Sequence, residues 1–399
     1  MSITSKLSGF DSSSSSADAR VQKYKEVIEK IFVDKDTDNA LKIVEHVVQD
    51  SFPQVVARDI MNIFAKAFDH LQNDQVLELG EATLELISDK NMLEEEECII
   101  RREVASVHQA RKDFSDAAKC LMKIKLENTV RNIDPKEKSE ILVSIAENWF
   151  SEDDAVNAEI YLNKATHVIL DVEDEEINTR YRYCKAKVFD SKRKFVFAAQ
   201  AYYELSSFEG SAIEEDNKFL LLKNAITCAV LAPVGPQKSR ILTTLTKDER
   251  SKNCPNYEML ERMFNDKVIN KKLSQEFEST LEEHQKATGS DGHSILETSV
   301  LEHNISVVSN IYTTISFEGL GTFLGISKSN AEKLISNMVI QGRISAILDQ
   351  RSEIIEFEKN EREKLSIWNE QIGVLCNDVN TVLSKILKEF PEAENYIAQ

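Results

Sequence analysis

The stretch that decides the fold is Ser294–Phe357, SILETSVLEHNISVVSNIYTTISFEGLGTFLGISKSNAEKLISNMVIQGRISAILDQRSEIIEF. Apolar residues in Ile295–Asn310 recur every three or four positions, which predicts a helix, and the β-branched run Thr313–Ile315 follows it. Apolar residues alternate with polar ones in Arg343–Phe357, on both sides of Gln350–Ser352. This alternation predicts two strands joined by a turn.

Two shorter helices are expected between the β-branched run and these strands. The first ends at Gly325, because glycine readily adopts the left-handed conformation that closes a helix; its apolar positions are Leu320, Phe323 and Leu324. The second begins at Ser327 or Ser329, since serine is a good N-cap; it is expected to bury Ala331, Leu334, Ile335, Met338 and Val339. The whole series predicts a winged helix, a domain that serves nucleic-acid recognition or the assembly of large complexes.

The composition favours assembly. The 399 residues carry 49 Lys and Arg against 68 Asp and Glu, a net charge of −19. Such a surface repels nucleic-acid phosphates and anionic membranes at long range. The only basic residues near the strands are Lys328, Lys333 and Arg343, and Glu332 lies among them. We interpret them as a solvated helix face.

The cysteines and the N-terminus bear on the compartment. The six cysteines are scattered, with no CxxC pair and no histidine at metal-ligand spacing: Cys98, Cys120, Cys184, Cys228, Cys254 and Cys376. They fit a reducing compartment, so we expect the cytoplasm and nucleus. The sequence has neither a signal-peptide core nor an apolar window long enough for a membrane span.

Residues 1–18, which include the run Ser12–Ser16, are expected to form a disordered polar leader. From residue 19 to 283 a helical period dominates and glycine is nearly absent, which predicts an all-helical region. Residues 284–293 are polar, contain two glycines and show no period, so an exposed loop is expected before the winged helix at residues 294–358. These boundaries leave residues 359–399 as a separate C-terminal segment.

A repeat of about 40 residues lies within the helical region. Asp113–Ala117 aligns with Asp154–Ala158 and Lys194–Ala198, and larger apolar residues follow one and two turns later. The aligned sets are Ala117, Ala158 and Ala198; Leu121, Leu162 and Tyr202; Ile124, Ala165 and Leu205. Small residues let helices approach closely, so each repeat is predicted to be a helical hairpin in a solenoid of the tetratricopeptide or HEAT type, which usually binds proteins.

A long helix is expected from Ser366 to about Phe390. Its apolar residues alternate steps of three and four, as in a coiled-coil seam: Leu365, Trp368, Ile372, Leu375, Val379, Val382 and Ile386. We predict that this stripe is buried in a bundle with other subunits. The alternative is that the helix folds back on its own winged helix.

We find no motif for catalysis, a cofactor or a metal. Gly235–Ser239 contains Lys-Ser but lacks the upstream glycine of a phosphate-binding loop. The seven histidines are isolated from one another, and the sequence has no HExxH or GxSxG motif. The chain is therefore expected not to be an enzyme.

A helical-repeat array that ends in a winged helix resembles the PCI domain, named for the proteasome lid, the COP9 signalosome and a translation initiation factor complex. The match extends to short sequence segments: Lys247–Arg250 after Leu242–Leu245, His284–Thr288, Ile295-Leu296, Glu302–Asn304, Ile315–Leu320, Ala331–Lys333 and Trp368–Leu387. These segments resemble the signalosome members of the family, in particular its fourth subunits. The resemblance covers nearly the whole chain and is strongest after Ala198.

The resemblance implies a non-catalytic scaffold in the complex that removes a ubiquitin-like modifier from cullins. It also implies that the end of the solenoid forms the helical half of the PCI domain, and that partners include other PCI subunits, an isopeptidase subunit and cullin-RING ligases. The wing hairpin is then expected to be a subunit interface, whose inner face packs on Leu334 and Met338 while its edge pairs with a neighbouring subunit; its residues are Ile344, Ala346, Leu348, Ile355 and Phe357. The polar loop becomes a candidate substrate-sensing element: His284, Lys286, Gly289, Asp291, Gly292 and His293.

Two alternatives remain open at this stage. The chain could be a PCI scaffold of the proteasome lid or the initiation factor complex, from which composition does not separate it. It could also bind nucleic acid through the helix Ser327–Gln341 of the winged helix, in which case binding should weaken steeply with salt.

Overall fold

The computed structural model describes residues 17–49, 52–88, 90–126, 133–208, 210, 213–288, 294–358 and 361–389. The chain divides into two compact units, Met1–Cys228 and Ala229–Gln399, and the division falls within helix α12. In the part that the structure describes, helices dominate and strands occur only in the winged helix. The predicted fold class is confirmed: a helical-repeat solenoid, a winged helix and a long C-terminal helix.

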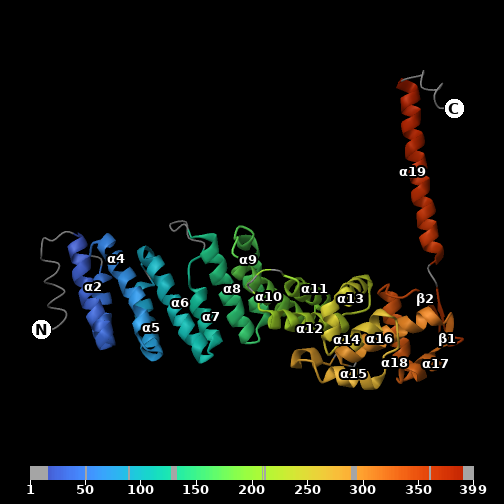
Figure 1. Ribbon diagram of the computed structural model, residues 1–399, viewed down its shortest axis with the longest axis horizontal. Helices are drawn as coiled ribbons and strands as arrows, with labels where there is room; N and C mark the ends of the chain where they lie inside the picture. Colours follow the sequence, from blue (N-terminus) through green and yellow to red (C-terminus); the bar gives the residue numbers. More distant parts are fainter. Residues whose placement is uncertain are drawn as a thin grey trace. The chain divides into compact units, whose positions relative to one another are not determined.

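The first unit is a succession of helices in which consecutive members lie side by side (Figure 1). The helices and 3-10 turns are α2 Ala17–Asp34, α3 Thr37–Val47, α4 Gln54–Lys66, η1 Ala67–His70, α5 Asn73–Ile87, η2 Asn91–Leu93, α6 Glu94–Arg111, α7 Phe114–Met122, α8 Pro135–Ser151, α9 Ala155–Ile169, α10 Glu175–Ser191, α11 Phe195–Ser206 and α12 Glu215–Leu231. The pairs α6/α7, α8/α9 and α10/α11 are the three hairpins of the predicted repeat.

The turn between the two helices of each repeat has the same backbone conformation. The residue before the turn is left-handed in all three, with φ of 68° at Lys112, 62° at Asp153 and 60° at Arg193. The next helix then begins two residues later in each case, and Asp154 caps α9 by accepting from the backbone N–H groups of Val156 and Asn157. The repeat is therefore one of turn geometry as well as of apolar residues.

The aligned apolar residues of the repeat are buried, as predicted. Ala117, Ala158 and Ala198 have no exposed surface, and each lies in the second helix of its hairpin. The residues aligned one and two turns later are also buried, and all but Ala165 are larger than alanine: Leu121, Leu162, Tyr202, Ile124, Ala165 and Leu205. This confirms the prediction that the aligned positions lie in the packed interior of the hairpins.

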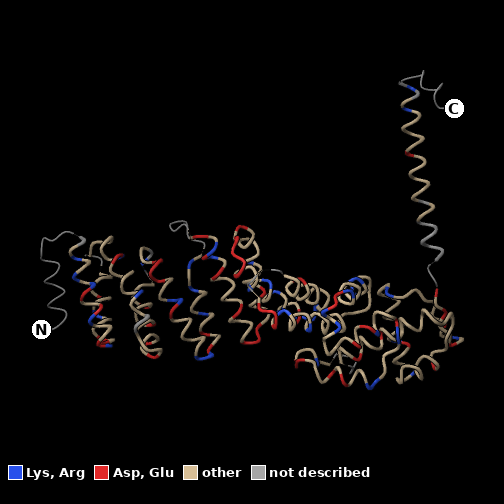
Figure 2. Tube along the Cα trace, viewed as in Figure 1, with Lys and Arg blue, Asp and Glu red and all other residues tan. Residues whose placement is uncertain are grey.

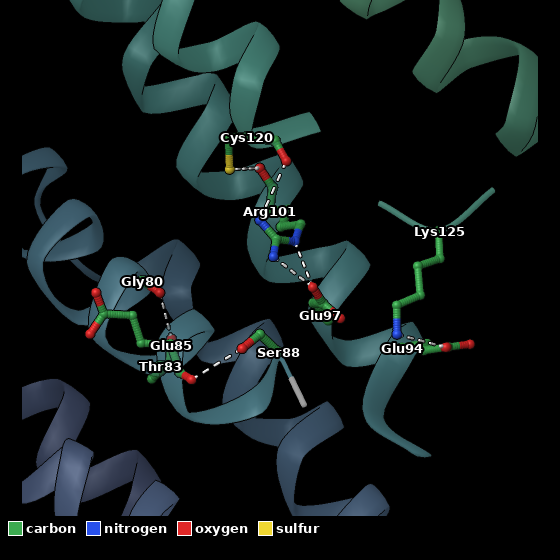
Figure 3. A network of polar contacts seen from close by, with 9 residues as sticks. All are labelled: Gly80, Thr83, Glu85, Ser88, Glu94, Glu97, Arg101, Cys120 and Lys125. Atoms are coloured by element: carbon green, nitrogen blue, oxygen red, sulfur yellow. Dashed lines mark hydrogen bonds and ion pairs between the residues drawn. The ribbon is translucent and has the colours of Figure 1, made fainter. Parts of the chain in front are cut away.

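A glycine allows a close approach of two helices in the first unit. Gly80 lies in α5 beside α6, and a Cβ added there would lie 2.4 Å from Cγ2 of Val104. One turn on, Thr83 donates its hydroxyl to the Gly80 carbonyl (Figure 3). The absence of a side chain is what lets the two helices pack at this point.

We expect Gly80→Ala to destabilise the chain by about 1–2 kcal/mol, although alanine is the better helix former by about 1 kcal/mol. The reason is that overpacking a tight core usually costs about 1–3 kcal/mol. Urea denaturation followed by circular dichroism measures the change. Gly373→Ala is the matched control, because Gly373 also lies within a helix but has open space around it. Equal effects of the two substitutions would contradict the close-packing argument.

The second unit begins with the end of α12 and contains the winged helix. Its elements are α13 Pro236–Lys247, η3 Glu249–Asn253, α14 Tyr257–Phe264, α15 Lys271–Glu278, η4 Glu283–Lys286, α16 Ile295–Ile311, β1 Thr314–Ser316, α17 Phe317–Leu324, α18 Lys328–Ile340, β2 Ala346–Asp349, β3 Ile354–Phe357 and α19 Glu361–Glu389. The helical period of the sequence predicts one helix over Tyr257–Ile269, and this is too long, because α14 ends at Phe264 and Asp266 is left-handed with φ of 50°.

The winged helix contains the predicted elements and one further strand pairing. The sheet order is β1–β3–β2 with both pairs antiparallel, so the β-branched run joins the hairpin as a third strand. Ser316 caps α17, Gly325 ends it in the left-handed conformation, and Ser327, rather than Ser329, caps α18. The core of the domain lies between α16, α17, α18 and the sheet.

Candidate assembly surfaces and their support

Helix α16 is buried on several faces and holds the second unit together. It starts with a capping box in which Ser294 accepts from the Glu297 N–H, and the Glu297 carboxylate accepts from the Ser294 N–H at 2.9 Å. Besides apolar residues it buries Ser299, His303 and Asn304. Buried polar side chains in a helix must find partners, and here the partners lie in other elements.

Asn304 fixes the chain segment between α14 and α15. Its Oδ1 accepts from the backbone N–H of Ile269 at 2.9 Å, and its Nδ2 donates to the carbonyl of the same residue at 3.2 Å. The side-chain amide of Asn304 thus makes the two hydrogen bonds with Ile269 that a neighbouring backbone segment would otherwise make. His303 holds the same segment, since its Nε2 lies 3.0 Å from the carbonyl oxygen of Lys267.

A buried ammonium group links α13 to α16. Nζ of Lys238 donates to the carbonyls of Val230 and Ala232, at 3.0 and 2.7 Å, and to Oγ of Ser299 at 3.1 Å. The Ser299 hydroxyl in turn donates to the Val230 carbonyl at 2.7 Å. Burial lowers the pKa of Lys238 to about 7, and the nearby Glu302 carboxylate partly opposes this shift. The network ties α13 and the end of α12 to the first helix of the winged helix.

Helix α16 also contacts the segment that leads into the wing. Glu302 forms an ion pair with Arg343 at 2.6 Å, and both side chains are largely buried. Glu302, His303 and Asn304 therefore reach two different segments from consecutive positions: the one before the wing and the one between α14 and α15. In the sequence, these three residues stand out only as one of the segments that resemble the PCI family. The available signal was that Ser299 and His303 lie four residues apart, on one helix face, among apolar residues.

The neutral state of His303 predicts a dependence of stability on pH. Burial lowers the pKa of His303 from its ordinary value, while the hydrogen bond to the Lys267 carbonyl opposes the change. The unfolded chain therefore binds a proton more readily, and stability present above about pH 6.5 is lost as the pH falls below it. We expect the free energy of unfolding to fall more steeply between pH 7 and 5 in the wild type than in His303→Gln, which cannot titrate. Parallel curves for the two proteins would exclude this role.

The predicted wing residues lie in the core of their own domain. Ile344, Ile355 and Phe357 are buried, and Ala346 and Leu348 pack against the same cluster, which includes Met338 of α18. Because side chains alternate along a strand, these five residues face inwards. The outward residues of the hairpin include Ile347 and Ile354, which are 53% and 42% exposed. A neighbouring subunit would therefore meet the outward face and the edge strand β2.

The stripe on the C-terminal helix is exposed in the single chain. Its described members are between 43% and 68% exposed: Trp368, Ile372, Leu375, Val379, Val382 and Ile386. The side chain of the remaining member, Leu365, lies outside the described residues. Charged residues are sparse only between Trp368 and Ile386 (Figure 2). Six large apolar side chains in contact with water are costly, so burial of this stripe against another apolar surface would be favourable.

The candidate loop is closed at its base. Thr288 and Ser294 form an isolated antiparallel bridge, and the N–H of Ile295 donates to the Ala287 carbonyl. The segment begins with the 3-10 turn η4, stabilised by a capping box between Glu282 and Gln285, rather than as an irregular loop. His284 and Lys286 lie in this turn, and His284 Nδ1 is 3.4 Å from the Glu282 carboxylate. The other candidates, Gly289, Asp291, Gly292 and His293, lie outside the described residues.

Helix α18 does not present a basic face. Lys328 is paired with Glu353, and Arg343 is paired with Glu302. Glu332 lies on the same helix and accepts from the side-chain amide of Gln350 at 2.5 Å. Of the three basic candidates for nucleic-acid contact, Lys333 alone has no carboxylate partner among the residues that the structure describes. This geometry disfavours nucleic-acid recognition by the winged helix.

In the described parts of the chain, no three His, Cys, Asp or Glu side chains gather closely enough to hold a metal ion. No helix among the same residues has the length and apolar character needed to cross a membrane. All six cysteines are free, and Cys98, Cys184, Cys228 and Cys254 are buried.

Comparison with known proteins places both units. Residues 6–216 match the family model described as PSMD12/CSN4, N-terminal, and residues 258–359 match the PCI domain. The chain is 33% identical to COP9 signalosome complex subunit 4 of Arabidopsis thaliana, over 93% of this chain and 94% of that protein. It is 34% identical to the protein of the same name in Drosophila melanogaster, over 98% and 96% of the two chains. The corresponding Dictyostelium discoideum protein is 33% identical over 94% of each chain.

Proposed function

The chain belongs to the COP9 signalosome subunit 4 family, and from that premise we propose how it acts in the assembly. As a member of this family it is a non-catalytic PCI scaffold subunit of the signalosome. The names of its relatives favour the signalosome over the proteasome lid and the initiation factor complex. We propose that its mechanism is positional: it holds other subunits and cullin-RING ligases in place for removal of the ubiquitin-like modifier.

The observation that carries the mechanism is the exposed stripe of α19. A solvent-exposed seam at coiled-coil spacing directly after a winged helix supports burial against helices of other subunits. We propose the bundle over the fold-back alternative, because the inner face of the winged helix is already filled by its own residues. The edge strand β2 supports a second contact, in which a neighbour adds to the sheet.

We further propose that the parts of the chain have separate roles. Residues 19–283, in which the last part contributes the helical half of the PCI domain, contact the cullin-RING ligase. Residues 294–358 and 359–399 join the subunit to its neighbours. The segment 284–293 responds to substrate, and the pairing of Thr288 with Ser294 supports this, because it joins the two residues that flank positions 289–293.

Purification of the tagged full-length chain from native lysate, followed by native mass spectrometry, tests the function. The proposal expects a stable assembly with other PCI subunits and a metal-dependent isopeptidase, and expects cullin-RING ligase to be retained when the lysate is rich in modified cullin. Recovery of the chain alone would contradict the scaffold function. Recovery of the assembly with no ligase under any loading would contradict the substrate-positioning role only.

A further inference from the structure

The second half of α10 and the turn after it are basic, in contrast to the acidic chain as a whole. Residues 180–194 read RYRYCKAKVFDSKRK, with seven Lys or Arg and a single carboxylate, Asp190. Asp190 is buried, so it contributes little negative charge to the surface. Arg180 and Lys192 pair with Glu147 and Glu159, and in a chain of net charge −19 the other cations still form a local excess that attracts negative groups.

Aromatic rings hold two of these cations where α10 meets α11. Nζ of Lys185 lies 5.9 Å from the ring centroid of Phe189, and Nζ of Lys194 lies 6.0 Å from the same centroid. The ring of Phe197, on α11, packs against Phe189 with the centroids 5.9 Å apart. We call these four residues the corner patch: Lys185, Phe189, Lys194 and Phe197.

The cations of the corner patch retain the capacity to bind an anion. Lys185 donates to the Tyr181 hydroxyl at 3.4 Å, and among the described residues no carboxylate forms an ion pair with it. Lys194 lies at the limit of ion-pair distance, 4.0 Å, from Glu159, and its side chain is half exposed. An aromatic ring attracts an ammonium group and orders it without neutralising its charge.

The corner patch also offers an apolar surface between the two charges. Phe197 is 51% exposed, and Phe189 beside it is partly exposed. Exposed aromatic rings flanked by ordered cations suit a ligand with one apolar group and carboxylates on either side. The exposed rings together with the two cations therefore restrict the ligand more than positive charge alone would.

We propose that the corner patch binds a short acidic segment of a partner protein, with an aromatic side chain set between carboxylates. The aromatic side chain covers Phe189 and Phe197, and the carboxylates pair with Lys185 and Lys194. A short peptide fits better than a nucleic acid. The phosphates of a long nucleic acid would extend beyond the patch and be repelled by the rest of the chain, which has 19 excess negative charges. This site is separate from the assembly surfaces, which lie in the second unit.

Fluorescence anisotropy with the full-length chain tests the proposal, with the labelled peptide EEFEE as the probe. We expect EEFEE to bind, and QQFQQ and EEAEE to bind more weakly. Lys185→Glu with Lys194→Glu should weaken EEFEE binding about tenfold or more, since two favourable charge contacts become repulsive. Phe197→Ala should weaken the binding of EEFEE but not that of EEAEE.

The matched control is Lys30→Glu with Lys66→Glu, which changes the net charge equally at two exposed lysines of the same unit. Equal loss of EEFEE binding in the control and the patch variant would overturn the proposal, because it would show a general charge effect. Tighter binding of a 20-nucleotide single-stranded RNA, lost in the patch variant, would also overturn it in favour of nucleic acid. Both double variants should still enter the native assembly, so failure of this proposal leaves the scaffold function intact.

Discussion

Leu375→Glu combined with Val382→Glu is expected to release the chain from its assembly while leaving it folded. Both residues lie on the exposed stripe of α19. Burial of a large apolar side chain contributes about 1.5–3 kcal/mol, so loss of two weakens association by roughly 10²–10⁴-fold. Burial of the new carboxylates would add a further cost. Native mass spectrometry after affinity purification should recover the variant without the other subunits.

Asn377→Glu with Ser384→Glu is the matched control for the stripe. These two exposed positions are also seven residues apart, but they lie on the opposite face of the same helix. Glutamate is a good helix former, so both variants should keep the far-ultraviolet circular dichroism of the wild type. Normal co-purification of the stripe variant would rule out the bundle, and loss of the control variant would point to a general effect of charge.

The second large effect is expected for Asn304→Ala. The substitution leaves the N–H and the carbonyl of Ile269 buried without partners. Each unsatisfied buried group costs about 1–3 kcal/mol, so we expect a loss of about 2–4 kcal/mol. Hydrogen exchange measured by mass spectrometry should show amides near Ile269 exchanging about 30-fold faster or more, the ratio that corresponds to 2 kcal/mol.

Asn310→Ala serves as the control, because Asn310 is exposed near the end of the same helix. Exposed substitutions usually change stability by less than about 0.5 kcal/mol. Exchange near Ile269 should then match the wild type. Unchanged exchange in Asn304→Ala would mean that water replaces the side chain, and α16 would lose its proposed role as the element that fixes this segment.

Much of the architecture was predictable because it depends on local signals. Gly325 and Ser327 end and begin helices through their own backbone and side-chain preferences, and the structure places them where the sequence predicts. The alanines of the repeat, such as Ala158, are buried because a periodic pattern fixes which helix face packs. The stripe of α19 is likewise readable from spacing alone.

The sequence was less informative where one residue acts on a distant one. Asn304 and Ile269 are 35 residues apart, and nothing near either position predicts that the amide serves that backbone. The end of α14 at Phe264 was missed for the same reason, because the hydrogen bonds of His303 and Asn304 to Lys267 and Ile269 join residues far apart in the chain. The alternation in the wing gave the inward residues correctly, but it did not show that an interface must use the other face.

The sequence by itself therefore determined the order and type of the elements, the repeat, the exposed seam and the absence of a recognisable catalytic motif, since all of these depend on residues close together in the chain. Only the tertiary structure decided how Lys238 finds its three acceptors, which wing residues face outwards, and how Phe197 comes to lie beside Phe189. These features depend on where separate elements meet. The physical reason is that burial and hydrogen bonding act through space, whereas periodicity and capping act along the chain.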